Sequence, residues 1–256
     1  MFPIIFRFFG LKVYAYGLLI GLGIAIGVLY LFKVGKKQIG LTETMINNLV
    51  IYIIVAAFVG GKVFLFFENP KKYANSPGLL LSGSGFVFYG SLIFCFGVLF
   101  WFMRKHKLPQ RLMLDIIAVV TCIVHIFGRV GCFLAGCCYG TPYEGAFGVV
   151  YTSTNSSAPL NCALHPVQLY EASAIFLLLI ILLVLKQFKR FEGQLFVTYL
   201  FVYPIIRIIT ETLRGDEERG YLFNGIISHS QFISLFIMLL GLYLFFKWRN
   251  TTSVKP

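Results

Sequence analysis

Two arginines lie within or at the end of apolar stretches of the chain. Arg129 closes a long apolar run, in the segment GRVGCFLAGCCYG (residues 128–140). Arg207 lies inside a second run, and Glu211 and Arg214 follow it at i+4 and i+7, a spacing that places the three on one helix face. Ionisable residues at membrane depth are costly and mark functional sites, and arginine offers a planar fork of donors that suits phosphate oxygens. We therefore predict a phosphate-binding site; the alternative is that each arginine is a snorkelling or structurally paired side chain.

A second polar group lies in the segment HPVQLYE, residues 165–171. Pro166 suits the first turn of a helix, and His165, Gln168 and Glu171 recur at three-residue spacing on one side. We expect these three side chains to line the entrance of the same site.

The composition is typical of a membrane protein. Hydrophobic residues make up 58% of the 256 residues and charged residues 12%, and the mean hydropathy is +0.83, whereas a soluble domain has about 45–50% apolar residues. The formal net charge is +12, but the positive residues lie in short clusters between apolar stretches, which argues against nucleic acid as a partner. We expect an integral membrane protein with a single domain over residues 1–256.

The apolar stretches that must position these residues predict the fold class. A membrane span needs about 20 mainly apolar residues, and the chain has seven candidate stretches, of which the fifth and seventh have short apolar cores. They cover approximately residues 13–32, 48–67, 86–103, 112–134, 172–185, 195–213 and 232–246. We predict an all-α integral membrane protein with seven transmembrane helices and an outer loop region at about residues 135–170.

Lysine and arginine in the loops predict the orientation of these spans. The segments KVGKKQ, RKHKLPQR, KQFKRFEG and KWRNTTSVK are basic, whereas residues 135–168 contain neither lysine nor arginine. By the positive-inside rule the N-terminus lies outside and the C-terminus in the cytoplasm. At 1.5 Å per residue, Arg129 lies about 25 Å and Arg207 about 18 Å from the cytoplasmic ends of their spans. Tyr16 and Tyr89 lie near the outer ends of the first and third spans. The two arginines and two tyrosines together predict a phospholipid site in the outer leaflet.

Five segments together resemble a known family. YAYGLLIGLG, FVFYGSLI, GRVGCFLAGCCYG, HPVQLYE and RIITETLRGDEE, in this order and spacing, are similar to the bacterial prolipoprotein diacylglyceryl transferases. The resemblance implies a multi-pass enzyme of the bacterial plasma membrane, with its active site facing the outer leaflet. Such enzymes transfer the diacylglyceryl group of phosphatidylglycerol to the thiol of a lipobox cysteine in a secreted prolipoprotein and release glycerol phosphate. We expect phosphatidylglycerol as a substrate, no metal or organic cofactor, no nucleic acid and a monomer.

The resemblance also implies roles for individual residues. Arg129 and Arg207 match arginines regarded as essential in the family and would hold and neutralise the phosphate. The remaining catalytic candidates are Glu211, which would fix their geometry, Tyr89, which would donate a hydrogen bond to the headgroup, and His165. The substrate-binding candidates are Tyr16, Arg214, Gln168, Tyr170 and Glu171.

Two segments depart from the family pattern. The third span of the family carries His-Gly-Gly-Leu-Ile-Gly, but here Tyr89 replaces the histidine, and tyrosine with a pKa near 10 is a poor base at neutral pH. The family signature Gly-Arg-x-Gly-Asn-Phe-x-Asn-x-Glu has Cys132, Ala135 and Cys137 in place of its two asparagines and glutamate. These departures leave open a changed acceptor or chemistry that uses a cysteine nucleophile or redox centre, and a non-catalytic lipid-binding protein.

Four roles are open for Cys132, Cys137, Cys138 and Cys162. A zinc site is one, although C-x4-C-C is an unfamiliar ligand spacing and neighbouring cysteines strain tetrahedral geometry. A disulfide from Cys162 to Cys137 or Cys138 is another, because the cell exterior is oxidising. A cysteine beside Arg129 is a candidate nucleophile, and free cysteines also pack as small apolar residues.

His125 lies one turn before Arg129 on the same helix face. A buried histidine with satisfied hydrogen bonds is the simplest interpretation. The alternatives are that His125 orients Arg129 or replaces the missing base.

Overall fold

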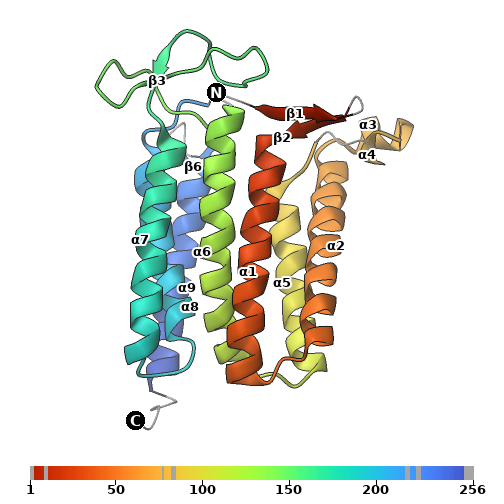
Figure 1. Ribbon diagram of the computed structural model, residues 1–256, viewed down its shortest axis with the longest axis vertical. Coiled ribbons are helices and arrows are strands. Elements are labelled where there is room, and N and C mark those ends of the chain that lie inside the picture. The colour runs from red at the N-terminus through yellow and green to blue at the C-terminus, as the bar shows by residue number, and fades with distance from the viewer. Residues whose placement is uncertain are drawn as a thin grey trace. The chain divides into compact units, whose positions relative to one another are not determined.

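Seven long apolar helices make up most of the computed structural model, which describes residues 3–8, 11–76, 78–81, 85–216, 220–222 and 226–250. Within these ranges seven helices are long and apolar enough to cross a membrane. They are α1 (Ala15–Ile39), α2 (Glu43–Glu68), α5 (Phe88–Lys105), α6 (Gln110–Ala135), α7 (Val167–Phe188), α8 (Gln194–Glu211) and α9 (His229–Arg249) (Figure 1). The prediction of a mostly helical protein with seven spans is confirmed.

The fifth and seventh spans are longer than the apolar cores that predicted them. Helix α7 begins five residues before the expected 172–185, and α9 begins three residues before the expected 232–246. A capping box fixes the start of α9: the Ser228 hydroxyl accepts from the Gln231 N–H, and the Gln231 side chain accepts from the Ser228 N–H. Both first turns carry polar residues, which hydropathy alone excludes from a span.

In the described ranges, three short antiparallel hairpins and two short helices lie before or between the long helices, and none of them was predicted. The hairpins are β1 (Ile4–Phe8) with β2 (Leu11–Tyr14), β3 (Val149–Val150) with β4 (Ala163–Leu164), and β5 (Tyr221–Leu222) with β6 (Ile227–Ser228). In register, Ile4 pairs with Tyr14, Val149 with Leu164, and Tyr221 with Ser228. The short helices are α3 (Pro70–Asn75) and α4 (Gly78–Leu81).

The chain divides into two compact units, and the smaller one, unit 2, comprises Phe32–Met113. Its helices α2 and α5 lie side by side (Figure 1). Gly60 and Gly90 permit this contact, because a Cβ on Gly60 would collide with the Gly90 carbonyl oxygen and a Cβ on Gly90 with that of Gly60. The Ser91 hydroxyl also donates to the Ala57 carbonyl oxygen at 2.8 Å. Small residues at the contact are typical of helix packing in membranes.

Unit 1 comprises Met1–Leu31 and Leu114–Pro256. Helix α7 packs on α8, and α8 on α9. Pro204 lies inside α8 and has no N–H, so the Leu200 carbonyl lacks its usual helical partner. Gly241 of α9 packs at that point, where an added Cβ would lie 3.4 Å from the Leu200 carbonyl oxygen.

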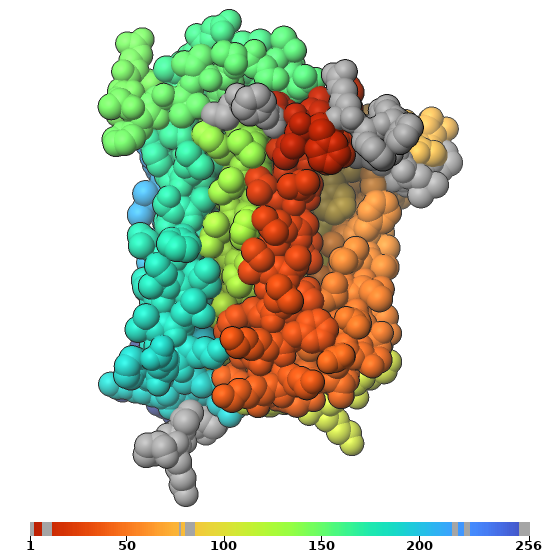
Figure 2. All heavy atoms as spheres, viewed as in Figure 1, coloured from red at the N-terminus to blue at the C-terminus, as the bar shows by residue number. Residues whose placement is uncertain are grey.

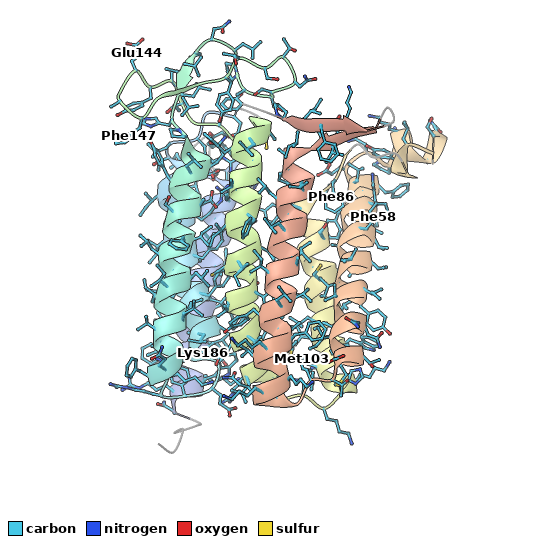
Figure 3. All side chains as sticks on the ribbon, in the orientation of Figure 1. Phe58, Phe86, Met103, Glu144, Phe147 and Lys186 are labelled. Carbon is cyan, nitrogen blue, oxygen red and sulfur yellow. The ribbon has the colours of Figure 1, made fainter. Side chains whose placement is uncertain are left out.

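The segment between α6 and α7 lies over the start of α7 (Figure 2). It has its own small core of Tyr151, Ala158 and Leu164. Its loop carries Glu144 and Phe147, whereas Lys186 lies toward the opposite end of α7 (Figure 3), where its ammonium group donates to the Tyr30 hydroxyl at 3.1 Å. Unit 1 therefore has polar segments at both ends of its helices, as expected of membrane-spanning helices.

Candidate functional site: a buried arginine and carboxylate network

The carboxylate of Glu171 lies at the centre of the site in unit 1. Its side chain is 1% exposed, with Arg129 Nη2 3.0 Å from Oε1 and Arg207 Nη1 3.6 Å from Oε2. Glu171 comes from the first turns of α7, Arg129 from the last turns of α6, and Arg207 from α8. Taking a charge out of water costs several kcal/mol, and the two guanidinium groups compensate this carboxylate.

Arg207 joins a second carboxylate to the network. Its Nη2 lies 2.7 Å from Glu211 Oε2, an i,i+4 pair within α8, and also donates to Ser230 Oγ of α9 at 3.1 Å. The contact between Arg207 and Glu211 agrees with the expectation that Glu211 fixes the geometry of the arginines. The two arginines and two glutamates have no formal net charge, so the cluster is electrostatically balanced inside the helices.

His125 and Tyr203 complete the surroundings of Glu171. Arg129 Nε donates to His125 Nε2 at 3.3 Å, so the imidazole helps to orient Arg129. This was one of the alternatives that the sequence left open for His125. The Tyr203 hydroxyl donates to Glu171 Oε1 at 3.5 Å, and the Tyr203 ring contacts the His125 ring edge-on at a centroid distance of 5.0 Å. Tyr203 was not predicted from the sequence, although its place four residues before Arg207 puts it on the same helix face.

Arg214 does not share a helix face with Arg207 and Glu211, and that prediction was wrong. Helix α8 ends at Glu211, and the chain then turns, with Arg214 forming an isolated antiparallel bridge with Gly140. The Arg214 guanidinium binds Asp216 through two contacts, Nε to Oδ1 at 3.1 Å and Nη2 to Oδ2 at 2.7 Å. It therefore anchors the segment after α8 near the start of the outer loop region.

The expectation that His165, Gln168 and Glu171 line one entrance was also wrong. Gln168 is 1% exposed and belongs to the interior, where its Nε2 donates to the Cys137 carbonyl oxygen at 2.8 Å and to the Tyr151 hydroxyl at 3.2 Å. His165 precedes α7, because the helix begins at Val167, so helical spacing does not apply to it.

His165 instead belongs to an aromatic group in the outer loop region. Its ring stacks on Tyr143 at a centroid distance of 3.9 Å, and its Nδ1 lies 3.4 Å from the Tyr170 hydroxyl. The two site candidates His165 and Tyr170 are therefore neighbours, in a group separate from the Glu171 carboxylate.

The tyrosine candidates Tyr16 and Tyr89 belong to different units. Tyr16 begins α1 in unit 1, is 43% exposed, and packs against Gly131 of α6, where a Cβ would lie 3.2 Å from Tyr16 Cα. Tyr16 therefore borders the helix turn that carries Arg129. Tyr89 belongs to unit 2, where its ring contacts Phe88 edge-on at 5.8 Å, and its role at a headgroup stays a prediction.

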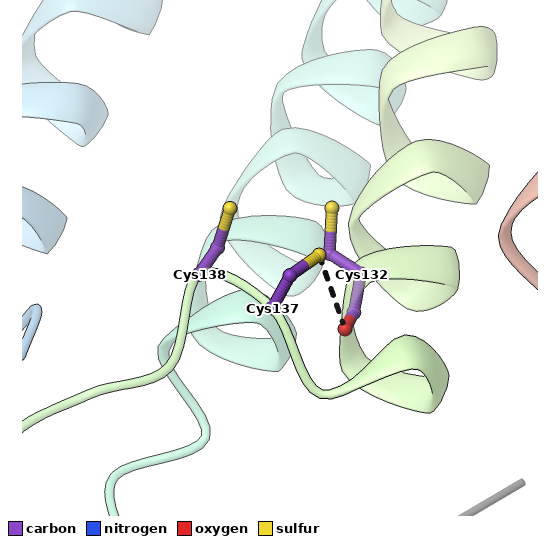
Figure 4. Close-up of side chains that lie close together, drawn as sticks. All are labelled: Cys132, Cys137 and Cys138. Atoms are coloured by element: carbon purple, nitrogen blue, oxygen red, sulfur yellow. Dashed lines mark hydrogen bonds between the residues drawn. The ribbon is translucent and has the colours of Figure 1, made fainter. Parts of the chain in front are cut away.

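Three of the predicted cysteines come together, and the fourth does not. All six cysteines lie within the described ranges and are free thiols, so the structure contains no disulfide from Cys162. The Sγ atoms of Cys132, Cys137 and Cys138 all lie within 4.8 Å of one another (Figure 4). Cys162 instead directs its Sγ to the Ala163 carbonyl oxygen at 3.7 Å and packs on the Tyr151 core.

The thiols that follow α6 differ in acidity. Hydrogen bonds with the Cys132 and Cys137 thiols, followed by the charges of Arg214 and Arg129, lower the pKa of Cys138. A hydrogen bond with Cys132 lowers the pKa of Cys137, but the neighbouring Cys138 and burial outweigh it and raise that pKa to about 11. Cys138 is therefore the thiol of this pair that ionises more readily.

Seven apolar helices and a charged network buried among three of them define a multi-pass membrane protein with a polar internal site. The model of the family described as prolipoprotein diacylglyceryl transferase matches residues 3–247. The chain belongs to this family.

Individual relatives agree with the family match. The phosphatidylglycerol–prolipoprotein diacylglyceryl transferase of Clostridium tetani is 39% identical over 246 residues, which cover 96% of this chain and 97% of the relative. Transferase 2 of the same name from Clostridium perfringens is 34% identical, over 96% of this chain and 97% of the relative. The corresponding protein of Rickettsia bellii is 33% identical, over 99% and 97%. The similarity thus extends along the whole chain.

Proposed function

We propose that this protein transfers the diacylglyceryl group of phosphatidylglycerol to the thiol of a lipobox cysteine in a secreted prolipoprotein, releasing glycerol phosphate. The observation that carries the proposal is the pair of arginines held on one buried carboxylate, in a chain whose relatives bear the name of this activity over their full length. The basic loops support an orientation with the N-terminus outside, which would turn this site toward the outer leaflet.

The reaction needs stabilisation of negative charge on a phosphate. The acceptor thiolate attacks a glyceryl carbon, a C–S bond forms, and the C–O bond breaks with its electron pair going to the departing glycerol phosphate. Hydrogen-bond donors that already point to the position where the negative charge develops lower the activation barrier of such a reaction most. Arg129 and Arg207 would supply those donors, because each guanidinium carries five N–H groups, and the neighbouring side chains do not occupy them all.

The two glutamates would act as positioning residues. Glu171 fixes Arg129 and Arg207 relative to each other, and Glu211 fixes Arg207 from the other side. This arrangement balances the charges before the lipid binds. It also holds both guanidinium groups in place when the lipid binds. A site already organised in this way avoids reorganisation during the reaction.

The other candidates would also contact the substrates. Tyr16 would close the outer wall, Tyr89 would donate a hydrogen bond to the headgroup, and His165 with Tyr170 would lie on the path of the acceptor. Arg214 would hold the outer loop region rather than the phosphate. The displacement needs no organic cofactor, the donor lipid is a substrate, and we expect the enzyme to act as a monomer on its own membrane.

The test uses the purified protein in phosphatidylglycerol vesicles with a lipobox peptide. We expect the peptide to gain the mass of one diacylglyceryl group while glycerol phosphate is released in equal amount. A peptide with serine in place of the lipobox cysteine is the matched control and should gain nothing, because the new bond is made to sulfur. Unchanged peptide mass with the cysteine peptide would refute the proposal.

A further inference from the structure

Three thiols converge where α6 ends. Cys132 lies in the last turn of α6, and Cys137 and Cys138 lie in the turn that follows. Their three Sγ atoms all fall within 4.8 Å of one another, and the Cys137 thiol donates to the Cys132 carbonyl oxygen at 3.8 Å (Figure 4). The three side chains are buried or half-buried, so the cluster belongs to the interior of unit 1.

The backbone conformation allows the adjacent residues Cys137 and Cys138 to direct their sulfurs to one metal ion without the strain that neighbouring cysteines usually place on tetrahedral geometry. Gly136 has φ 73° and Cys138 has φ 59°, so left-handed residues flank Cys137 on both sides. Cys138 is not glycine, and such a conformation is uncommon in other residues. Hydrogen bonds hold this turn: the Cys137 N–H donates to the Cys132 carbonyl oxygen at 3.1 Å, and Gln168 Nε2 donates to the Cys137 carbonyl oxygen at 2.8 Å. The turn is therefore fixed with its sulfurs together.

The dimensions and charges suit a thiophilic metal ion. Zinc–sulfur bonds of about 2.3 Å in a tetrahedron place the sulfurs about 3.8 Å apart, so a small contraction of the cluster would complete the site. Three thiolates and Zn²⁺ carry one net negative charge. Arg214 and Arg129 interact electrostatically with Cys138 and would favour that charge, although each is also paired with a carboxylate.

The cluster offers three ligands and leaves a fourth position open. In the part of the chain that the structure describes, neither a fourth cysteine nor a histidine or carboxylate joins the group. Cys162 faces the Ala163 carbonyl oxygen instead. Three protein ligands with one open position are typical of catalytic zinc sites, whereas structural sites are closed by four.

We propose that Cys132, Cys137 and Cys138 bind one Zn²⁺ ion as thiolates and leave its fourth position for the thiol of the acceptor. The second half of this proposal rests on the proposed function, whereas the metal site itself does not. Coordination releases the proton of the acceptor thiol to solvent. Its sulfur then supplies the electron pair of the new C–S bond, while the pair of the broken C–O bond leaves on glycerol phosphate.

The first test measures metal in the purified protein. After loading with ZnCl₂ and desalting, we expect about one zinc per chain in the wild type and in Cys162→Ser, the control from the same loop region. Cys132→Ser, Cys137→Ser and Cys138→Ser should each lose most of it. Wild-type protein without bound zinc, or equal loss in Cys162→Ser, would overturn the proposal.

A second measurement avoids substitutions that disturb folding. Wild-type protein is alkylated with and without zinc, and each cysteine is followed by mass spectrometry. We expect zinc to protect Cys132, Cys137 and Cys138, while the reaction of Cys162 stays unchanged. A disulfide within the cluster that forms readily and resists zinc, or equal labelling in both samples, would contradict the site.

Cobalt tests the open position. Co²⁺ bound by the three thiolates should show sulfur-to-metal charge-transfer absorption, and the lipobox cysteine peptide should shift its ligand-field bands, whereas the serine peptide should not. A cobalt spectrum unaffected by the cysteine peptide overturns the acceptor position. A shifted spectrum with no lipid transfer would refute the proposed function alone, and lipid transfer at full rate in metal-free protein would refute the zinc role alone.

Discussion

Asp115 and Glu171 are both buried carboxylates in unit 1, but their partners differ in kind. Asp115, near the start of α6, is 2% exposed and accepts from the backbone N–H groups of Gly193 at 3.0 Å and Phe196 at 3.1 Å, with Lys189 Nζ at 3.4 Å. Glu171 lies toward the other end of α6, and the partners found for it are side chains: the cations Arg129 and Arg207 and the donor Tyr203.

The difference separates a carboxylate held mainly by backbone donors from one held mainly by cations. The backbone donors of Asp115 are the unpaired N–H groups at the start of α8, so this carboxylate fixes where that helix begins. The arginines around Glu171 can exchange one anionic partner for another, because carboxylate and phosphate oxygens both suit a guanidinium. A carboxylate held by cations therefore marks a place where a phosphate can bind.

The largest effect is expected on stability when Glu171 loses its charge. Glu171→Gln leaves Arg129 and Arg207 buried with only Glu211, and breaking such a buried pair lowers the free energy of unfolding by about 3–5 kcal/mol. Phosphatidylglycerol should recover more stability in the variant than in the wild type, because its phosphate replaces the missing carboxylate. Unfolding in detergent with and without the lipid measures both. Glu144→Gln, on the exposed loop, is the control, and equal stabilisation of all proteins by the lipid would exclude the arginines as its site.

Removing either arginine should mainly affect catalysis. We expect Arg129→Ala and Arg207→Ala to reduce kcat by about 10²–10³-fold, the usual consequence of losing one preorganised charge-stabilising donor. Glycerol phosphate release measures the rate. Lys189→Ala removes the cation beside Asp115 and should leave kcat nearly unchanged. If it fell as far as in the arginine variants, the distinction between the two carboxylates would fail.

Asp115→Asn should affect stability without affecting turnover. The amide group that replaces one oxygen meets the N–H donors of Gly193 or Phe196, and a buried donor left without an acceptor costs about 1–3 kcal/mol. The free energy of unfolding should fall by that amount, while kcat per folded molecule stays at the wild-type value. A large loss of kcat in well-folded Asp115→Asn would show that the start of α8 controls the site.

The sequence alone predicted the spans and the two arginines, because both depend on simple local signals. Hydropathy identified seven helices, and Arg129 and Arg207 were conspicuous as charges among apolar residues. The hairpins β3–β4 and β5–β6 were missed, since strands of two residues show no alternation. Arg214 was misplaced because nothing between Glu211 and Gly215 signals a helix end, so the i+7 spacing looked continuous.

The remaining parts of the site depend on tertiary structure. Glu171 was assigned to an entrance, but its central place follows only from the approach of α6 and α8 to the first turns of α7. The cysteine cluster was disfavoured by its spacing, because sequence does not reveal that Cys138 takes a left-handed conformation. Both errors concern residues whose partners lie on other elements or whose backbone is unusual, which local patterns do not describe.

The smallest effect on kcat is expected from the loss of the longest hydrogen bond to Glu171. Tyr203→Phe removes the hydroxyl that donates to Glu171 at 3.5 Å and keeps the ring that contacts His125. A single hydrogen bond contributes about 0.5–1.5 kcal/mol, so kcat should fall by about 2- to 12-fold. Tyr199→Phe is the control, because its ring stacks on Tyr203 at 5.5 Å but, among the described residues, its hydroxyl donates no hydrogen bond to Glu171. Equal loss in both variants would mean that the aromatic stack, and not the hydroxyl on the carboxylate, sets the position of Glu171 between its arginines.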